Sequence, residues 1–177
     1  VALLSVTCNL PVGACTRVVY KGPDKTVITA RSMDWKSEID PNIWVFPKGM
    51  QRSGEVGPLS IKWASKYGSI VASAWDIATT DGMNEKGLVA NLLWLGESEY
   101  PEFNPNGAKE GMSISLWAQY VLDNFATVKK VVDYMKDEPF VVVSDYILGS
   151  ERLTTVTLSI SDAHCATAVF ESTRGNV

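Results

Sequence analysis

The chain has 177 residues, of which 46% are hydrophobic and 20% are charged. That composition is typical of a single globular domain with a sizeable core, and it argues against disorder, collagen and tandem repeats. The net charge of −4 disfavours a nucleic-acid partner. No apolar stretch reaches the roughly 18 residues that span a bilayer, so stable membrane insertion is not expected.

Histidine and cysteine are scarce. The chain has one histidine, His164, and three cysteines, Cys8, Cys15 and Cys165. A single imidazole disfavours a zinc site built from histidines, and we expect neither a metal nor a cofactor. Three cysteines without a CxxC pair also disfavour a disulfide framework.

The first fourteen residues are typical of the end of a secretory signal peptide. Val1–Val6 is apolar, and Pro11–Ala14 supplies the small residues that a signal peptidase requires before Cys15. We therefore interpret residues 1–14 as a signal-peptide remnant or pro-segment, and we expect a periplasmic or secreted protein. The alternative is a buried first strand that its proline interrupts.

After Cys15 the sequence is mostly typical of β-strands separated by turn residues. The predicted strands are 16–20, 26–31, 43–46, 59–63, 69–75, 79–84 and 89–95. We expect hairpins between the first and second of these strands, between the fourth and fifth, and between the sixth and seventh. Asp81-Gly82 and Asn84–Gly87 are typical hairpin residues, and we interpret both as turns.

From Ser113 the period of the apolar residues becomes helical. We predict one helix from Ser113 to Asn124, and a second that Thr127 caps and that ends before Pro139. Strands are predicted again at 140–143, 152–160 and 166–170. Strands, then two helices, then strands predict an α+β layered fold.

Cys15, Arg31 and Asp34 form the most distinctive set of residues. Once residues 1–14 are removed, Cys15 carries both a thiol and an α-amine. The α-amine has a pKa near 8, roughly 2 units below that of lysine, so it can accept the thiol proton. A hairpin would return Arg31 and Asp34 to Cys15, where the cation lowers the thiol pKa and the carboxylate orients the amine. Taken singly, these residues are typical of a surface ion pair and a small buried thiol, so the prediction rests on their combination.

Two motifs contain these residues, Cys15-Thr16-Arg17 and Arg31-Ser32-Met33-Asp34-Trp35, and a third motif is Thr80–Leu88. Together they resemble the choloylglycine hydrolase and penicillin V acylase family, whose members are N-terminal-nucleophile amide hydrolases. Three more segments are similar to the Gram-negative penicillin V acylase branch of that family: Ala90–Leu95, Glu97–Pro101 and Trp117–Phe125. The likeness runs from Cys15 to about residue 171.

The resemblance implies a role for each matching residue. Cys15 would be the nucleophile, and Arg31 and Asp34 the catalytic arginine and aspartate. The main-chain N–H of Trp94 would contribute to the oxyanion hole. Trp35 and Trp94 resemble the aromatic pair that lines the acyl pocket, and core packing is the alternative for both indoles.

The resemblance also implies a four-layer αββα sandwich. In the family a second catalytic asparagine and arginine lie in a segment that would follow Val177, so residues 15–177 would form the N-terminal half of an N-terminal-nucleophile hydrolase domain. A homo-oligomer is expected, by resemblance a tetramer.

The expected substrate is a small N-acyl amide, with penicillin V or an N-acyl homoserine lactone favoured by the aromatic pocket. Conjugated bile salts are the alternative within the same chemistry. The alternative of another class is a chain without catalysis, either inert or binding an acyl ligand.

Overall fold

A computed structural model of the chain describes residues 15–35, 38–147 and 149–173. The proposed signal remnant, residues 1–14, lies outside the described residues. The elements are, in chain order, β1 (Thr16–Lys21), β2 (Val27–Ser32), β3 (Asn42–Phe46), β4 (Gln51–Ser53), β5 (Lys62–Ala64), β6 (Ser69–Ala74), β7 (Ala78–Asn84), β8 (Val89–Trp94), β9 (Gly111–Ser113), the 3₁₀ turn η1 (Ile114–Leu116), α1 (Trp117–Asn124), α2 (Val128–Met135), β10 (Val141–Val143), β11 (Val156–Ser161) and β12 (Thr167–Phe170).

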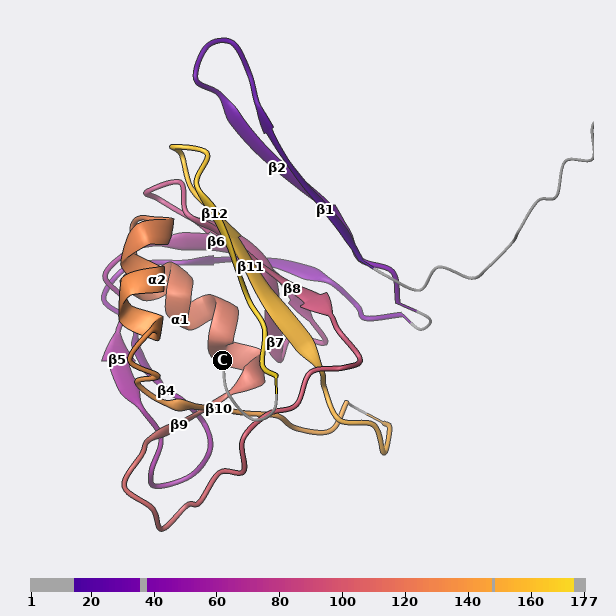
Figure 1. Ribbon diagram of the computed structural model, residues 1–177, viewed down its shortest axis with the longest axis vertical. Helices are drawn as coiled ribbons and strands as arrows, with labels where there is room; N and C mark the ends of the chain where they lie inside the picture. The colour runs from indigo at the N-terminus through magenta and orange to yellow at the C-terminus, as the bar shows by residue number, and fades with distance from the viewer. Residues whose placement is uncertain (1–14, 36–37, 148, 174–177) are drawn as a thin grey trace, which may run out of the picture.

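A six-stranded antiparallel sheet forms the centre of the fold (Figure 1). Its strand order is β12-β11-β8-β7-β6-β3, so β7 and β8 lie in the middle and β3 lies at an edge. Successive residues of a strand point to opposite faces. In β8 this alternation directs Ala90 and Leu92 to one face and Asn91 to the other, and all three are buried.

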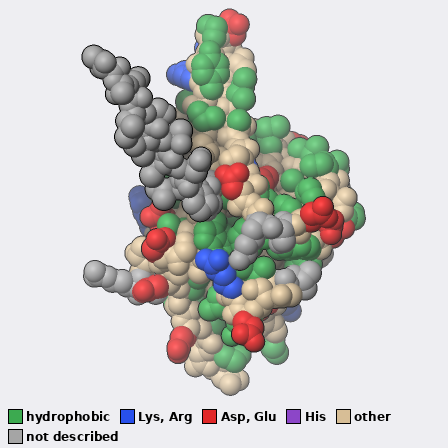
Figure 2. Space-filling view, turned by 90° about the vertical axis from the view of Figure 1, so that its right-hand side faces the viewer, with side chains coloured by type: hydrophobic (Ala, Val, Ile, Leu, Met, Phe, Trp, Pro, Cys, Tyr) green, Lys and Arg blue, Asp and Glu red, His purple; other side chains and the backbone are tan. Residues whose placement is uncertain are grey.

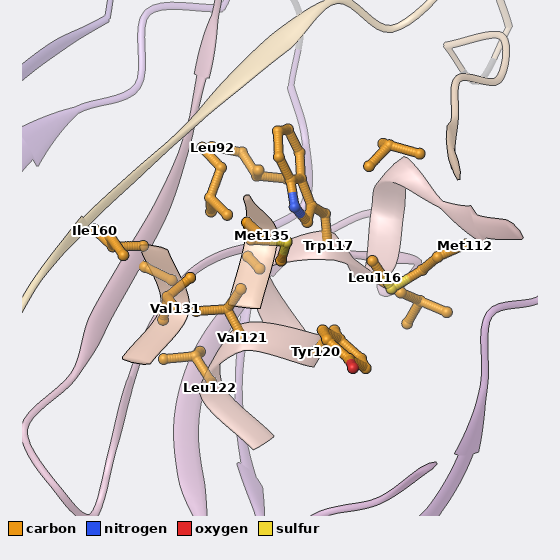
Figure 3. Packing of buried hydrophobic residues seen from close by; sticks show 14 of the residues in the cluster. Leu92, Met112, Leu116, Trp117, Tyr120, Val121, Leu122, Val131, Met135 and Ile160 are labelled. Carbon is orange, nitrogen blue, oxygen red and sulfur yellow. The ribbon is translucent and has the colours of Figure 1, made fainter. Parts of the chain in front are cut away.

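The helices cover the apolar face of the sheet (Figure 1). Trp117, Val121 and Leu122 of α1 are fully buried, and Figure 3 shows them packing with residues of α2, β8 and β11. Gly82 of β7 permits this close approach, because a Cβ at residue 82 would lie 2.7 Å from Leu122 Cδ1. α2 begins as the sequence predicts, with the Thr127 hydroxyl accepting a hydrogen bond from the Lys130 N–H.

The β1–β2 hairpin lies on the opposite face of the sheet. Its inward-facing Arg17 donates hydrogen bonds to the side chains of Asn91 and Ser161, which belong to β8 and β11. The turn of the hairpin projects beyond the sheet (Figure 1). Figure 2 shows hydrophobic side chains along this projection, and Val18 and Tyr20 on its outer face are more than half exposed.

Several predicted elements are confirmed and one predicted pairing is wrong. The β1–β2 and β7–β8 hairpins and both helices form where the sequence predicts. Residues 59–63, however, do not pair with residues 69–75. β5 pairs with β4, and β6 pairs with β3 and β7. The β4–β5 hairpin instead packs against α1, where Arg52 and Trp63 both contact Asp123.

The prediction of a turn at Asp81-Gly82 is also wrong, since both residues lie within β7. The turn at Asn84–Gly87 is confirmed, with the Gly87 N–H donating to the Asn84 carbonyl and a positive φ of 78° at Gly87. The strand predicted from residue 152 begins only at Val156.

The α+β class predicted from the sequence is confirmed. The helices, the six-stranded sheet and the β1–β2 hairpin supply, within the described residues, an α layer and two successive β layers of the expected αββα sandwich. Among the described helices, each is too short or too polar to cross a membrane.

Candidate active site

The two central strands of the sheet separate at one end, and this opening defines the site. β6 and β7 remain paired as far as Ala74↔Ala78. The described β7–β8 pairing stops earlier, at Asp81↔Asn91. β7 and β8 therefore diverge beyond this point, while β8 stays paired with β11 as far as Trp94↔Val156.

The divergence leaves backbone groups of β8 facing the opening. The N–H of Leu95 donates to the Thr155 carbonyl over 3.1 Å, so odd-numbered residues at this end of β8 direct their backbone groups toward β11. In an antiparallel strand the intervening residues direct theirs to the other side. The backbone N–H of Trp94 consequently points toward β7, past the last described pair of the β7–β8 ladder.

A pocket of about 300 Å³ occupies this opening. Its walls come from three regions: the hairpin and the segment after it, the diverging ends of β6, β7 and β8, and the segments around residues 113–115 and 145–156. The residues that line it are mostly apolar, and they include Cys15, Met33, Trp35, Ile39, Trp75, Ile77, Leu92, Trp94, Ile114, Tyr146, Ile147 and Val156. Such a cavity suits a ligand group that is itself apolar.

The two tryptophans predicted to form an acyl pocket do lie together on its wall. The rings of Trp35 and Trp94 are 5.2 Å apart at an interplanar angle of 57°. Both side chains are half-buried, which leaves part of each indole accessible. On the Trp94 ring, the guanidinium of Arg152 lies 4.3 Å from the centroid, in cation–π geometry.

The turn between β6 and β7 supplies another part of the wall, through Trp75 and Ile77. Trp75 and Asp76 have left-handed backbone conformations, with φ of 52° and 54°. The Asp76 carboxylate accepts hydrogen bonds of 2.9 to 3.0 Å from the side chains of Asn42, Trp44 and Ser73. These hydrogen bonds, that of the Trp44 indole first, lower the pKa of Asp76. The turn is thus anchored to β3 and β6 from outside the pocket.

Cys15 lies at the edge of the pocket, immediately before β1. The next residue, Thr16, pairs with Ser32, and its N–H donates to the Ser32 hydroxyl over 3.2 Å. Continuing that register places Cys15 opposite Met33, and both residues line the pocket. The Cys15 side chain is half-buried, so its sulfur is accessible from the cavity.

Arg31 lies on the same inward face of the hairpin, two residue pairs further along the ladder than Cys15 and Met33. Its Nε is 2.9 Å from Asp81 Oδ1, and its Nη2 donates to the Leu92 carbonyl of β8. The side chain is only 8% exposed. The structure thus places a buried cation between the hairpin and the sheet, directly behind a wall of the pocket.

Asp34 lies just beyond β2, at the end of the hairpin where β1 begins. It is exposed, and its described hydrogen bond comes from the Ser32 hydroxyl, 3.2 Å from Oδ2. Asp34 follows Met33 directly, so it lies near Cys15 along the hairpin. Its predicted role at the α-amine stays a prediction.

Sequence reasoning missed the polar groups that surround Arg31. Asn91 Nδ2 donates to Asp81 Oδ1 over 2.8 Å, and Arg17 Nε donates to Asn91 Oδ1 over 2.7 Å. Burial lowers the pKa of Arg17, and the charge of Asp81 opposes that shift. One sequence signal could have found these groups. Asp81 and Asn91 are polar residues at positions of buried strands where the side chain faces inward.

Within the described ranges, no group of three or more His, Cys, Asp or Glu side chains could hold a metal ion. The described residues bring three groups together at this site. An accessible thiol lies at the border of the apolar cavity, the backbone N–H of Trp94 faces the opening, and the Arg31 guanidinium is buried behind the wall.

Known proteins match this chain over nearly its whole length. The model of the linear amide C–N hydrolases, choloylglycine hydrolase family, matches residues 15–177. A penicillin V acylase of Pectobacterium atrosepticum is 48% identical over 178 residues, which cover 96% of this chain and 47% of that protein. The chain thus spans about half the length of the curated relative that it matches.

Solved structures show the same fold. The penicillin V acylase of Agrobacterium tumefaciens has a TM-score of 0.82 and 52% identity, over 90% of this chain and 47% of that one. A mutant of the conjugated bile acid hydrolase of Clostridium perfringens has a TM-score of 0.75 and 24% identity, over 92% of this chain and 49% of that one. The latter likeness concerns the fold alone.

Proposed function

Because the chain belongs to the choloylglycine hydrolase family of linear amide C–N hydrolases, we propose that it provides the nucleophile and acyl pocket of an amide hydrolase. The observation that carries the proposal is the position of Cys15, whose thiol borders an apolar pocket with the buried Arg31 behind its wall. The family match begins at Cys15, which supports this residue as the first of the active domain.

The proposed reaction begins with a proton transfer inside one residue. After removal of residues 1–14, the α-amine of Cys15 takes the proton of its own Sγ. The thiolate attacks the amide carbonyl carbon, and a tetrahedral intermediate forms. The C–N bond then breaks, the leaving nitrogen takes the proton from the α-ammonium, and a thioester remains on Cys15.

Water completes the cycle. The α-amine accepts a proton from water as its oxygen attacks the thioester carbon. The C–S bond breaks, the carboxylic acid departs, and the proton returns to the thiolate. We assign supporting roles to two groups. The Trp94 N–H would donate to the oxyanion, and the charge of Arg31 would favour the thiolate.

The substrate that fits the pocket best has an apolar or aromatic acyl group. Trp35 and Trp94 offer accessible indole faces, and the lining is mostly apolar. We therefore infer that penicillin V or an N-acyl homoserine lactone is preferred, with conjugated bile salts second. The likeness at 48% and 52% identity to two penicillin V acylases supports this order.

The proposal extends to the location and assembly of the protein. A free Cys15 amine requires that residues 1–14 be cleaved, and the signal-like pattern of those residues favours a periplasmic or secreted enzyme. A homo-oligomer is proposed as well. The half-exposed apolar residues on the outer face of the hairpin provide surface that a neighbouring subunit could bury.

A matched pair of cysteine variants tests the nucleophile, in the protein as the cell produces it. We expect Cys15→Ala to abolish hydrolysis of penicillin V, while Cys165→Ala, which changes the other described cysteine, retains it. Intact mass should show a wild-type chain that begins at Cys15 and gains one acyl group from a slowly hydrolysed substrate. Unchanged turnover in Cys15→Ala would refute the proposal.

The same experiment addresses the alternatives. Faster cleavage of glycocholate than of penicillin V would reverse the order of substrates without changing the mechanism. A protein that binds phenoxyacetate but neither turns over nor becomes acylated would be an acyl-ligand-binding protein.

A further inference from the structure

We propose that Asp81 is a positioning residue that fixes the guanidinium of Arg31 and leaves one of its donors for the reacting groups at Cys15. This inference rests on the proposed function, because it assigns Arg31 a part in that reaction. Its basis is the set of contacts in the layer between the β1–β2 hairpin and the central sheet.

The Arg31 guanidinium is held at two of its three nitrogens. Nε lies 2.9 Å from Asp81 Oδ1, and Nη2 donates to the carbonyl of Leu92. These partners belong to β7 and β8, the two strands that diverge at the pocket. They act at different points of a planar group, so together they fix both its location and the orientation of its plane.

The third nitrogen is left over. Arg31 Nη1 is buried and has neither a hydrogen-bond partner nor an ion-pair contact among the described residues. Nε also lacks a hydrogen bond, and its described contact is the ion pair with Asp81. A buried donor without a partner destabilises a folded protein, so its retention calls for a use. The use that we infer lies in the pocket, because two of its lining residues are close to Arg31. Leu92 accepts the hydrogen bond from Nη2, and Met33 follows two residues after Arg31 on the same face.

Asp81 is itself held in place. Asn91 Nδ2 donates to Asp81 Oδ1 over 2.8 Å, and Arg17 Nε donates to Asn91 Oδ1 over 2.7 Å. The bond from Arg17 fixes which end of the Asn91 amide carries the oxygen, so the amide must present its NH₂ group to Asp81. The orientation of Arg31 is thus determined by a chain of partners that begins in β1.

The charges of this layer do not cancel. The charged groups that face Asp81 are Arg31 of β2 and Arg17 of β1, whereas β8 and β11 contribute the neutral Asn91 and Ser161. Two cations and one carboxylate leave a formal charge of +1 in the layer between the hairpin and the sheet. Asp81 therefore has two separable effects on Cys15: it fixes a cation geometrically, and its own negative charge moderates the field of both arginines.

Two substitutions separate these effects in the protein as the cell produces it. Asp81→Asn removes the charge and weakens the hold on Arg31. We expect kcat for penicillin V to fall about 100-fold while KM changes less than about threefold, because the loss is one of geometry in the transition state. The acid limb of the pH profile should move roughly 0.5 to 1 unit lower, because a lost negative charge favours the thiolate.

Asp81→Glu keeps the charge but lengthens the side chain. We expect a reduced kcat with the acid limb at its wild-type pH. The matched control is Asp123→Asn, which breaks the other described Arg–Asp pair of the core, that with Arg52. It should lower the melting temperature yet leave both kcat and the acid limb unchanged. The same kcat loss in Asp123→Asn as in Asp81→Asn would overturn the proposal.

Two further measurements keep the test independent of folding and of the proposed function. We expect Asn91→Ser to fold even if Asp81→Asn fails to do so. This variant loosens Asp81 without changing the charge of the layer. An unchanged kcat in that variant would overturn the proposal, whereas a loss of about tenfold would support it. Alkylation of Cys15 by iodoacetamide, followed against pH by peptide mass, reports the thiol without any turnover. A midpoint that Asp81→Asn does not lower would overturn the proposal even if amide hydrolysis were absent.

Discussion

Two buried Arg–Asp pairs lie on opposite faces of the central sheet, and their distances are almost the same. Arg31 Nε is 2.9 Å from Asp81 on the hairpin face, and Arg52 Nε is 3.0 Å from Asp123 on the helix face. The arginine side chains are 8% and 15% exposed. Distance and the burial of the arginines alone would assign them one role, although Asp81 is 22% exposed and Asp123 is fully buried.

Their remaining partners differ. Asp123 is fully buried and also accepts hydrogen bonds of 2.8 Å from Trp63 Nε1 and Gln119 Nε2, while the Arg52 guanidinium stacks on the ring of Phe46. These partners join the β4–β5 hairpin to α1. In both pairs the buried Nε contacts its carboxylate without a hydrogen bond, but Arg31 additionally keeps Nη1 without a described partner. The role of a buried ion pair is therefore indicated by the further donors that it leaves free.

The largest effect is expected from removing each arginine in turn. Arg31→Met should lower kcat/KM by about 1,000-fold, or about 4 kcal/mol, because a cation beside the reacting groups is lost. Arg52→Met should leave kcat/KM within about twofold of the wild-type value, because Arg52 lies away from the pocket. It should instead lower the free energy of unfolding. Steady-state kinetics and urea unfolding of both variants measure this difference. Equal activity losses would show that the two pairs are equivalent.

A smaller effect is expected from neutralising Asp123, the carboxylate that joins the β4–β5 hairpin to α1. Asp123→Asn should lower the free energy of unfolding by about 3 kcal/mol, because Arg52 is left in the core without its counter-charge. The control is Asp133→Asn, which removes an exposed partner of Lys129 and should cost less than about 1 kcal/mol. Urea titrations with a common m-value provide both numbers. A loss at Asp123 no larger than that at Asp133 would contradict the assigned role.

The smallest effect concerns pH. Burial raises the pKa of Asp123, against the opposing hydrogen bonds of Trp63 and Gln119 and the charge of Arg52. Between the ordinary aspartate pKa of about 3.9 and this raised value, the folded state binds more protons than the unfolded chain, so this group makes stability fall as pH rises. The stability difference between the wild type and Asp123→Asn should therefore shrink as pH rises through that window. Chemical unfolding at a series of acidic pH values tests the sign, and a widening difference would contradict it.

The elements were predictable where local signals determined them. Thr127 caps α2, Gly87 closes the β7–β8 turn, and the β1–β2 hairpin forms around residues 21–25. The partners of β5 and β6 were not predictable in this way. They depend on packing against α1 and on the edge position of β3, and both involve residues far apart in the sequence.

The residues of the candidate site differ in the same way, since local signals predict some of them and not others. The catalytic roles of Cys15 and Arg31 stay predictions, but the hairpin that brings the two residues together was predictable from their spacing. Asp81 was not, since Asp-Gly is the usual signature of a tight turn. Here the glycine serves another purpose, because α1 leaves no room for a Cβ at residue 82, and the strand continues through it. That contact is visible only once the sheet and helix are in place.

The turn that carries Trp75 and Ile77 into the pocket has a consequence for engineering. Two adjacent non-glycine residues in the left-handed region cost of order 1 kcal/mol each, and the Asp76 hydrogen bonds offset part of that strain. Replacing Trp75 alone with glycine should relieve the strain at that residue and keep the Asp76 hydrogen bonds, while it removes an indole from the cavity. A laboratory search for thermostable variants would thus favour a change at residue 75 that also broadens the range of acyl groups the pocket accepts. Selectivity and heat resistance are therefore opposed at this position.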